Sequence, residues 1–238
     1  MKVEIWSDVV CPWRYIGKRR FEAALARFAH RDQVEVVWRS FELDPRAPPR
    51  VGERPADRLA AKYGLTREQA LETHARLTRL AADVGLSFRF DIAQSGNTFD
   101  AHRLLHLAAE RNVQDAAKER LLRAYFSEGE PIGDRETLVR LVAEVGVPAD
   151  EVRAVLAGQA YADAVRADEA EATALGITGV PFFVLDRRFG VSGAQPPEVL
   201  LAALHQAWAA SHPIERLTPV GAAASKEAGA CTDETCAI

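Results

Sequence analysis

The stretch Trp6-Ser7-Asp8-Val9-Val10-Cys11-Pro12-Trp13-Arg14-Tyr15-Ile16-Gly17 decides the fold, because it joins a predicted strand to a predicted helix. Residues 2–6 alternate polar and apolar side chains, and residues 14–30 place apolar side chains at helical spacing. Pro12 suits the first helical turn, where its missing N–H loses no hydrogen bond. Cys11 is therefore predicted to be the N-cap, where free backbone N–H groups and the helix dipole stabilise a thiolate.

Beyond this junction, a second strand pattern is followed by a long helical segment. Residues 33–41 alternate again, which predicts a strand–helix–strand unit with parallel pairing. Residues 44–53 are dense in Pro, Arg and Gly and are typical of a linker. From there the pattern is helical to about residue 176, with Thr66 in a capping box and Asp134 at another helix start.

The C-terminal part returns to strand patterns before a last amphipathic helix. The strands are predicted at residues 179–185 and 188–192 around a turn at Asp186-Arg187, and the helix at residues 197–208. This layout predicts an α/β protein, a thioredoxin-like fold with an inserted all-helical domain. The expected parts are a thioredoxin-like domain of residues 1–45 and 177–215, a helical insertion domain of residues 46–176, and a tail of residues 216–238.

The composition indicates a globular protein and gives no sign of a nucleic-acid or membrane partner. Of the 238 residues, 48% are hydrophobic, which is ample for a buried core. The net charge of −4, with Lys and Arg scattered among Asp and Glu, gives no electrostatic footprint for nucleic acid. No apolar run has transmembrane length and no secretory signal pattern is present, so we expect a cytoplasmic protein. The sequence leaves its oligomeric state open.

The junction at Cys11 resembles a known family in detail. The run Cys-Pro-Trp-x-Tyr-Ile-Gly-Lys-Arg-Arg-Phe after a strand is similar to the DsbA family of thioredoxin-fold oxidoreductases, most closely its FrnE-like subgroup. The resemblance implies a reactive Cys11 with Pro12, Trp13 and Arg14 as active-site neighbours. That subgroup usually carries Cys-x-x-Cys, and Arg14 stands at the second cysteine position. Any further sulfur must therefore come from elsewhere.

Arg14 has three interpretations. It can lie on the same helix face as Cys11, where its charge would favour the thiolate and attract an anionic substrate group. It can instead point to water and contribute little. It can also be a substitution, natural or engineered, for a cysteine in an otherwise intact site.

Two further segments resemble parts of the same family. Residues 176–181 are similar to the cis-proline loop of thioredoxin-fold enzymes, although X–Pro bonds are trans by base rate. The resemblance implies that Val180 and Pro181 flank Cys11 and offer backbone groups to an extended substrate. Residues 97–103 resemble a helix start that lines the cleft between the two domains, with Asn97 as an N-cap.

His102 follows on that helix and is expected to pack or line the cleft, with an acid–base or substrate contact as a further hypothesis. It shares a helix face with His106 at a spacing that can hold a metal ion. A third ligand is not identifiable from the sequence. No metal site is therefore predicted.

These features predict a protein-disulfide oxidoreductase or isomerase in which the Cys11 thiolate attacks a substrate disulfide. The partners would be disulfide-containing proteins or peptides. Cys231 or Cys236, a substrate thiol or a small thiol would then resolve the mixed disulfide, and a passive tail is the alternative for the Cys-x4-Cys pair. No bound cofactor is predicted, and glutathione or another small thiol is left open as a co-substrate. Because residue 14 is arginine, single-cysteine chemistry is favoured over net dithiol oxidation.

Two other functions remain as alternatives. One is a glutathione-dependent isomerase or transferase resembling the hydroxychromene-carboxylate isomerase and kappa-class relatives, which place serine at the position of Cys11. Those relatives tend to carry an aspartate in the turn before the last helix, whereas this chain has Ser192-Gly193-Ala194-Gln195. The other alternative is a non-redox peptide-binding chaperone that uses the cleft around Val180 and Pro181.

Overall fold

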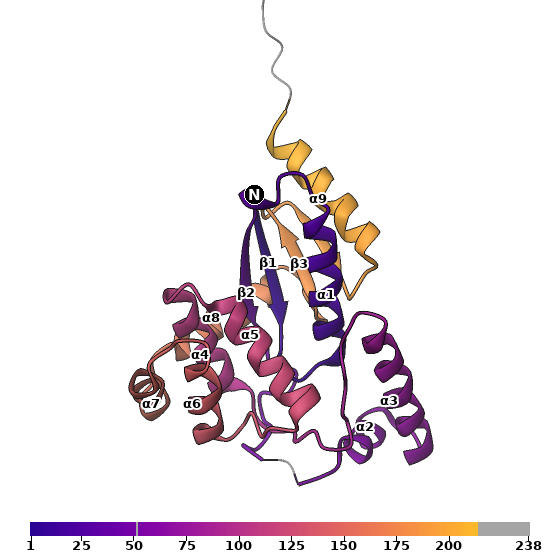
Figure 1. Cartoon of the computed structure of the whole chain (residues 1–238), viewed down its shortest axis with the longest axis vertical. Coiled ribbons are helices and arrows are strands. Elements are labelled where there is room, and N and C mark those ends of the chain that lie inside the picture. Colours follow the sequence, from indigo (N-terminus) through magenta and orange to yellow (C-terminus); the bar gives the residue numbers. More distant parts are fainter. Residues whose placement is uncertain (51, 214–238) are drawn as a thin grey trace, which may run out of the picture.

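The computed structural model describes residues 1–50 and 52–213. Within those ranges one mixed sheet has the strand order β2-β1-β3-β4 (Figure 1). Its strands are β1 (Lys2–Ser7), β2 (Glu35–Ser40), β3 (Phe182–Leu185) and β4 (Phe189–Ser192). The parallel pairing of β1 with β2 confirms the strand–helix–strand prediction, and β3 runs antiparallel to β1. The central strand β1 therefore ends at the junction that carries Cys11.

The β3–β4 hairpin closes at the predicted turn. Asp186 and Arg187 have φ angles of 46° and 57°, and the Arg188 N–H donates to the Leu185 carbonyl at 3.0 Å. Positive φ at two successive residues matches the twist of a tight hairpin, and aspartate tolerates it better than most residues. The Asp186 carboxylate also accepts from the Lys2 N–H at 2.6 Å, which joins the hairpin to the start of β1.

Helices cover both faces of the sheet. On one face α1 (Pro12–Ala26) and α9 (Pro197–Ser211) lie side by side, and the Phe21 ring lies 5.4 Å from that of Phe183 (Figure 1). On the other face Trp6 is buried beside α8 (Ala162–Ala174), and its indole N–H donates to the Asp168 carbonyl at 2.9 Å. This is the α/β arrangement that the sequence predicts.

The remaining helices lie between β2 and β3 in the sequence, as the predicted helical insertion requires. They are α2 (Pro55–Tyr63), α3 (Arg67–Ala82), α4 (Phe99–Glu110), α5 (Gln114–Arg123), α6 (Arg135–Ala143) and α7 (Ala149–Ala157), with a short helical turn at Ala124–Glu128. Another short helical turn, Arg31–Gln33, precedes β2. The capping box at Thr66 and the cap at Asp134 are confirmed. None of the helices in the described ranges is long and apolar enough to cross a membrane.

The helical segment and the sheet share α1. Phe21 and Ala24 of α1 pack in the cluster against the sheet, whereas Tyr15 and Ile16 belong to the core of the helical segment. Tyr15 also donates to Glu119 of α5 at 2.5 Å. Because both sides of α1 are buried, the start of this helix is held firmly where the two parts meet.

The linker after β2 is held against the helical segment by close backbone contacts. The Asn97 N–H donates to the Pro48 carbonyl at 2.9 Å, and the Asn97 side chain donates to the carbonyls of Pro45 and Ala47 at 3.3 and 3.2 Å. The backbone of Gly133 lies so near Pro49 that a Cβ there would be 2.0 Å from the Pro49 carbonyl oxygen. Only glycine allows this approach.

Gly133→Ala is expected to lower the free energy of unfolding by about 2 kcal/mol, because the linker must move away to admit the methyl group. Urea denaturation measures the loss. Gly52→Ala is the matched control, since a Cβ at Gly52 meets nothing within 4 Å. Equal stability of the two variants would contradict the close linker contact.

Candidate active site

Cys11 is the N-cap of α1, as predicted. Its φ and ψ are −101° and 123°, Pro12 begins the helix, and the Cys11 side chain makes no capping hydrogen bond. The Cys11 carbonyl accepts from the Arg14 N–H at 3.1 Å, which closes the first turn. The side chain is half-buried. The thiol therefore lies at a positive helix end and still reaches solvent.

Arg14 belongs to this first turn of α1, and its side chain is buried, with 1% of the residue exposed. The interpretation in which Arg14 points to water is therefore wrong. Its Nη1 lies 3.7 Å from Asp8 Oδ2, and within the described residues none of its three side-chain nitrogens makes a hydrogen bond. Burial lowers the pKa of Arg14, while the negative charges of Cys11 and Asp8 act to raise it. Arg14 is thus a buried cation in the same helical turn as Cys11, with one carboxylate near it.

Asp8 follows β1 and supplies that carboxylate. Its Oδ1 accepts from the Val9 N–H at 2.8 Å and its Oδ2 from the Leu43 N–H at 2.8 Å. Burial acts to raise the pKa of Asp8, but the hydrogen bond from His102 and the charge of Arg14 outweigh it and hold the pKa well below its usual range. Asp8 is therefore ionised at neutral pH.

His102 packs against Asp8 and lies deeper than expected. It is 0% exposed, and its Nε2 lies 3.4 Å from Asp8 Oδ1. Burial lowers the pKa of His102, although Asp8 opposes the shift. Of the two expected roles, packing is the one that the structure shows, because the whole ring is covered behind Asp8 and His102 is not among the residues that line the cleft. Its neighbour His106 contacts Asp168 Oδ2 at 3.2 Å, so the two histidines face different carboxylates.

Lys118 of α5 completes the cluster and was not foreseen. It is 0% exposed, its ammonium donates to the Ser7 carbonyl at 3.2 Å, and it lies 5.6 Å from the Trp38 ring centre. Burial, together with repulsion from Arg14, lowers the pKa of Lys118 to about 7. The sequence signal was a lysine on the apolar face of a helix beside Leu121. We call Asp8, Arg14, His102 and Lys118 the buried charge cluster.

The pKa of Lys118 predicts how stability depends on pH. An unfolded lysine titrates near 10.4, so between about pH 7 and 10 the unfolded chain binds one proton more than the folded chain. This contribution makes stability rise with pH across that window. Lys118→Met should be more stable than the parent at pH 7 by about 2 kcal/mol, and the difference should shrink toward pH 10.

Urea denaturation at several pH values between about 7 and 10 measures this difference. Lys62→Met serves as the control because Lys62 is exposed, and its stability difference from the parent should stay flat. A pH-independent difference for Lys118→Met would mean that Lys118 is charged in the folded protein throughout.

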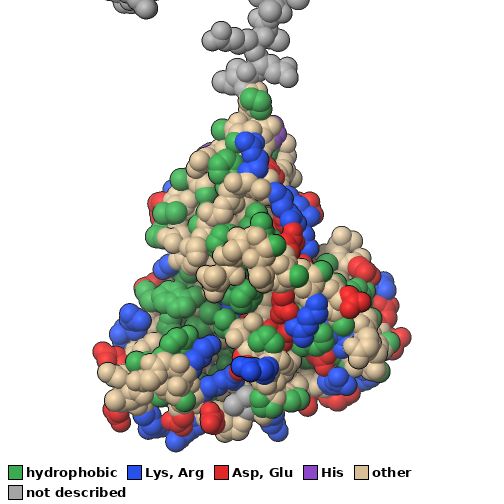
Figure 2. Space-filling model, turned by 180° about the vertical axis from the view of Figure 1, so that it is seen from behind, with side chains coloured by type: hydrophobic (Ala, Val, Ile, Leu, Met, Phe, Trp, Pro, Cys, Tyr) green, Lys and Arg blue, Asp and Glu red, His purple; other side chains and the backbone are tan. Residues whose placement is uncertain are grey.

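Cys11 opens onto a cleft of about 490 Å³. One wall is the start of α1, and the other is formed by α2 and α3. The lining includes Val10, Trp13 and Leu43 near Cys11, and Arg58, Leu59, Lys62, Tyr63, His74, Leu77, Phe90 and Tyr125 opposite. Figure 2 shows hydrophobic side chains gathered in a hollow beside these helices, at the lower left of that view. The cleft is thus mainly apolar, with two cationic side chains on the α2 wall.

Asn97 holds the linker instead of lining this cleft. The helix α4 begins at Phe99 with Thr98 as N-cap, so the prediction that Asn97 caps it is wrong. The Asn97 side chain accepts from the Phe99 N–H at 2.9 Å while its amide group binds linker carbonyls. By fixing the linker, Asn97 helps to place Leu43 and Asp44 at the cleft edge.

The Val180–Pro181 peptide bond is cis. The Pro181 ring lies over α1, 3.0 Å from where a Cβ on Gly17 would be, and the Pro181 carbonyl accepts from the Gly193 N–H at 2.8 Å. The proline loop and the helix that begins at Cys11 therefore lie against each other. The two tail cysteines, Cys231 and Cys236, fall outside the described residues.

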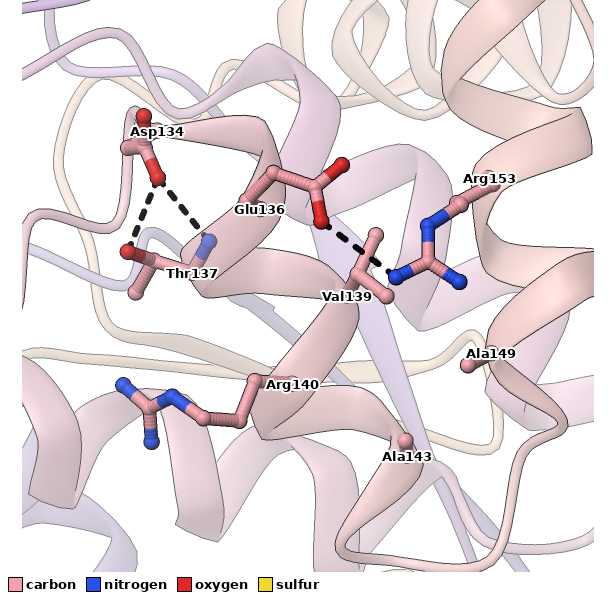
Figure 3. A pocket seen from close by; sticks show the side chains of 8 residues that line it. All are labelled: Asp134, Glu136, Thr137, Val139, Arg140, Ala143, Ala149 and Arg153. Atoms are coloured by element: carbon pink, nitrogen blue, oxygen red, sulfur yellow. Dashed lines mark hydrogen bonds and ion pairs between the residues drawn. The ribbon is translucent and has the colours of Figure 1, made fainter.

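A second hollow lies between α6 and α7 (Figure 3). Its charged groups bind one another, since Arg153 pairs with Glu136 at 3.3 Å and Asp134 accepts from the Thr137 N–H at 2.9 Å. It shares no lining residue with the cleft at Cys11. We therefore take the Cys11 cleft as the candidate active site.

Comparison with known proteins agrees with this geometry. Residues 2–205 match the model of the DSBA-like thioredoxin domain. The chain belongs to the DSBA-like thioredoxin family. This membership confirms the resemblance of the Cys11 junction to the DsbA family and the predicted fold class.

Individual members of the DSBA-like family and related structures extend this comparison. A probable DsbA oxidoreductase from Streptomyces coelicolor is 50% identical, with 100% of this chain and 99% of that chain covered and a TM-score of 0.86. The uncharacterised protein YwbO of Bacillus subtilis is 28% identical over 190 residues, 77% of this chain and 86% of YwbO. The cytosolic disulfide reductase DsbM from Pseudomonas aeruginosa with GSH is 21% identical, covers 87% of this chain and 98% of its own, and has a TM-score of 0.59. At that identity DsbM supports the fold alone.

Proposed function

We propose that this DsbA-like protein carries out thiol–disulfide exchange through a single thiolate, that of Cys11. The observation that carries the proposal is the pairing of an N-cap thiol with a buried arginine in the same helical turn. Arg14 occupies the position three residues after Cys11, so no disulfide can form within α1. Instead, a buried positive charge stands in the same helical turn as the one thiol that reacts.

The buried charge cluster supports the same conclusion. Arg14 carries a buried positive charge, Lys118 adds a second when protonated, and Asp8 supplies one negative charge. Buried charges are costly unless they are balanced. In this proposal a thiolate on Cys11 offsets the positive charge that Lys118 adds when it is protonated.

The exchange step needs no bound cofactor. The Cys11 thiolate attacks one sulfur of a substrate disulfide, a new S–S bond forms, and the old one breaks. The departing sulfur leaves as a thiolate and takes a proton from solvent. A second thiol then attacks the mixed disulfide and returns Cys11 to the thiolate.

The cleft supports disulfide-bearing peptides or glutathione conjugates as substrates. Its apolar lining suits side chains next to a disulfide, and Lys62 suits a carboxylate. In this proposal Val180 and Pro181 flank Cys11 and offer backbone groups to the substrate. We further propose that the protein acts in the cytoplasm and that glutathione is the small thiol.

Cys231 and Cys236 are proposed to release the substrate when no small thiol is present. The test compares the parent with the variant Cys231→Ser/Cys236→Ser, using a peptide disulfide as substrate and no glutathione. The parent should release reduced peptide once per chain, whereas the variant should accumulate the mixed disulfide on Cys11. Added glutathione should restore release in the variant.

Two results would count against these proposals in different ways. Equal peptide release by both proteins without glutathione would remove the tail from the mechanism and leave Cys11 in place. Absence of any adduct on Cys11 in the variant would overturn the proposed function itself.

A further inference from the structure

The buried guanidinium of Arg14 has more hydrogen-bonding capacity than its surroundings use. A guanidinium carries five N–H donors, and buried donors are normally paired. Within the described residues Nε, Nη1 and Nη2 of Arg14 make no hydrogen bond, although the side chain is fully covered. The nearest carboxylate oxygen, Asp8 Oδ2, lies at 3.7 Å, which is too long for a hydrogen bond. Among the described residues Arg14 therefore has no hydrogen-bond acceptor.

Asp8 cannot move to fill that role without losing other bonds. Its two oxygens already accept from Val9 and Leu43, and Oδ1 also faces His102. The guanidinium carbon of Arg14 also lies 6.0 Å from the centre of the Phe41 ring, which offers a π face and no strong acceptor. The missing acceptor must come from outside this set of side chains.

The burial of Arg14 restricts which acceptor can reach it. A carboxylate on a peptide or on glutathione is attached to a large group, and the covered guanidinium gives such a group no access. Cys11 is half-buried and lies in the same helical turn, where its carbonyl accepts from the Arg14 N–H at 3.1 Å. An oxygen atom attached to the Cys11 sulfur, or a peroxide oxygen approaching it, meets both requirements.

We propose that Cys11 and Arg14 form a site for a small hydroperoxide, at which Cys11 is oxidised to a sulfenate whose oxygen Arg14 binds. This would add a thiol-dependent peroxidase activity to disulfide exchange. It rests on the proposed function only in needing a nucleophilic Cys11. The same guanidinium would stabilise the negative charge that develops on the peroxide oxygens.

The reaction balances with a hydroperoxide as oxidant and a small thiol as reductant. The Cys11 thiolate attacks one peroxide oxygen, so an S–O bond forms, the O–O bond breaks, and the sulfur gives up two electrons. The departing alkoxide or hydroxide takes a proton from solvent. One small thiol then displaces water from the sulfenic acid to form a mixed disulfide. A second small thiol releases the oxidised thiol pair and restores Cys11.

The test uses hydrogen peroxide and the Cys231→Ser/Cys236→Ser background, in which Cys11 is the only cysteine. Two rate constants are measured for Cys11 by mass spectrometry: sulfenate formation, trapped with dimedone, and alkylation by iodoacetamide. Alkylation reports the thiolate alone, whereas the peroxide reaction also reports stabilisation of the oxygen. The ratio of the two rate constants therefore isolates the contribution of Arg14 to the peroxide reaction.

Arg14→Met should lower this ratio about 100-fold, the usual effect of removing one preorganised donor. Arg14→Lys, which keeps the charge but not the planar donor set, should lower it less. Arg27→Met is the matched control, since Arg27 lies just after the same helix and pairs with Glu198 on the surface. It should leave the ratio unchanged, and circular dichroism should show that each variant is folded.

Each outcome bears on a different claim. A ratio that stays at the parent value in folded Arg14→Met and Arg14→Lys would overturn the peroxide proposal and leave disulfide exchange intact. A parent Cys11 that reacts with neither peroxide nor iodoacetamide would instead contradict the proposed function.

Discussion

Replacing Cys11 with serine is expected to reduce thiol–disulfide exchange at least about 1000-fold, because the hydroxyl of serine cannot form or break an S–S bond. Cys11 is the only cysteine among the residues that the structure describes. The measurement is the steady-state reduction of a glutathionylated peptide by glutathione. The double tail variant serves as the comparison and should retain most of the parent rate, because glutathione itself resolves the adduct.

The same variant separates the main alternatives. A glutathione-dependent isomerase that uses a bound glutathione thiolate would keep its activity in Cys11→Ser, since the reacting sulfur would belong to the ligand. A non-redox chaperone would keep peptide binding and show no exchange activity even in the parent. Full exchange activity in Cys11→Ser would contradict the assignment of Cys11 as nucleophile.

Asp8→Asn is expected to lower the free energy of unfolding by about 3 kcal/mol at neutral pH. The substitution keeps the shape of the side chain and leaves Arg14 buried without a carboxylate. It also removes or weakens the acceptor that Asp8 offers to the Leu43 N–H. Breaking one partner out of a buried pair is more harmful than removing both. Asp8→Asn combined with Arg14→Met should therefore recover part of the loss.

The pH dependence of this loss follows from the lowered pKa of Asp8. A carboxyl group whose folded pKa lies below its unfolded value contributes stability above the unfolded pKa, near 3.9, and loses it as pH falls through the folded pKa. The gap between parent and Asp8→Asn should stay constant near neutral pH and narrow below about pH 4. Urea denaturation across this range measures it.

Asp44→Asn is the matched control for Asp8→Asn. Asp44 lies at the cleft edge and pairs with Arg58 at 2.8 Å, but its side chain is 46% exposed. Such a pair contributes about 0.5 kcal/mol. If Asp8→Asn costs no more than Asp44→Asn, the buried charge cluster does not hold the junction together as described.

The parts of the site that depend on local sequence could be predicted. Cys11 before Pro12 is enough to specify an N-cap, because the missing N–H of proline and the strand before it leave few other conformations. The parallel pairing of β1 and β2 followed from the single helix between them. These features depend on residues that are neighbours along the chain.

The buried charge cluster could not be predicted, because it draws on three distant segments. Asp8 and Arg14 flank Cys11, whereas His102 and Lys118 reach it from α4 and α5. Sequence periodicity places a lysine or histidine on an apolar helix face but does not identify the groups packed against that face. The burial of Arg14 likewise depends on the helices that cover α1.

The error at Asn97 has a physical cause. An asparagine side chain can accept from the N–H two residues ahead in a turn as readily as it caps a helix, and here it accepts from Phe99. The linker carbonyls of Pro45 and Ala47 bind the amide group and fix this choice. The cleft walls from α2 and α3 were missed for a related reason, since nothing local in those helices points to Cys11.

The most direct test of the central claim is disulfide trapping on Cys11 in the Cys231→Ser/Cys236→Ser variant. The protein is incubated with oxidised glutathione, digested without reductant, and analysed by mass spectrometry. Our account predicts one glutathione attached at Cys11 and its complete release when a small thiol is added. A protein that stays unmodified, while exchange of the same disulfide still proceeds, would contradict the account.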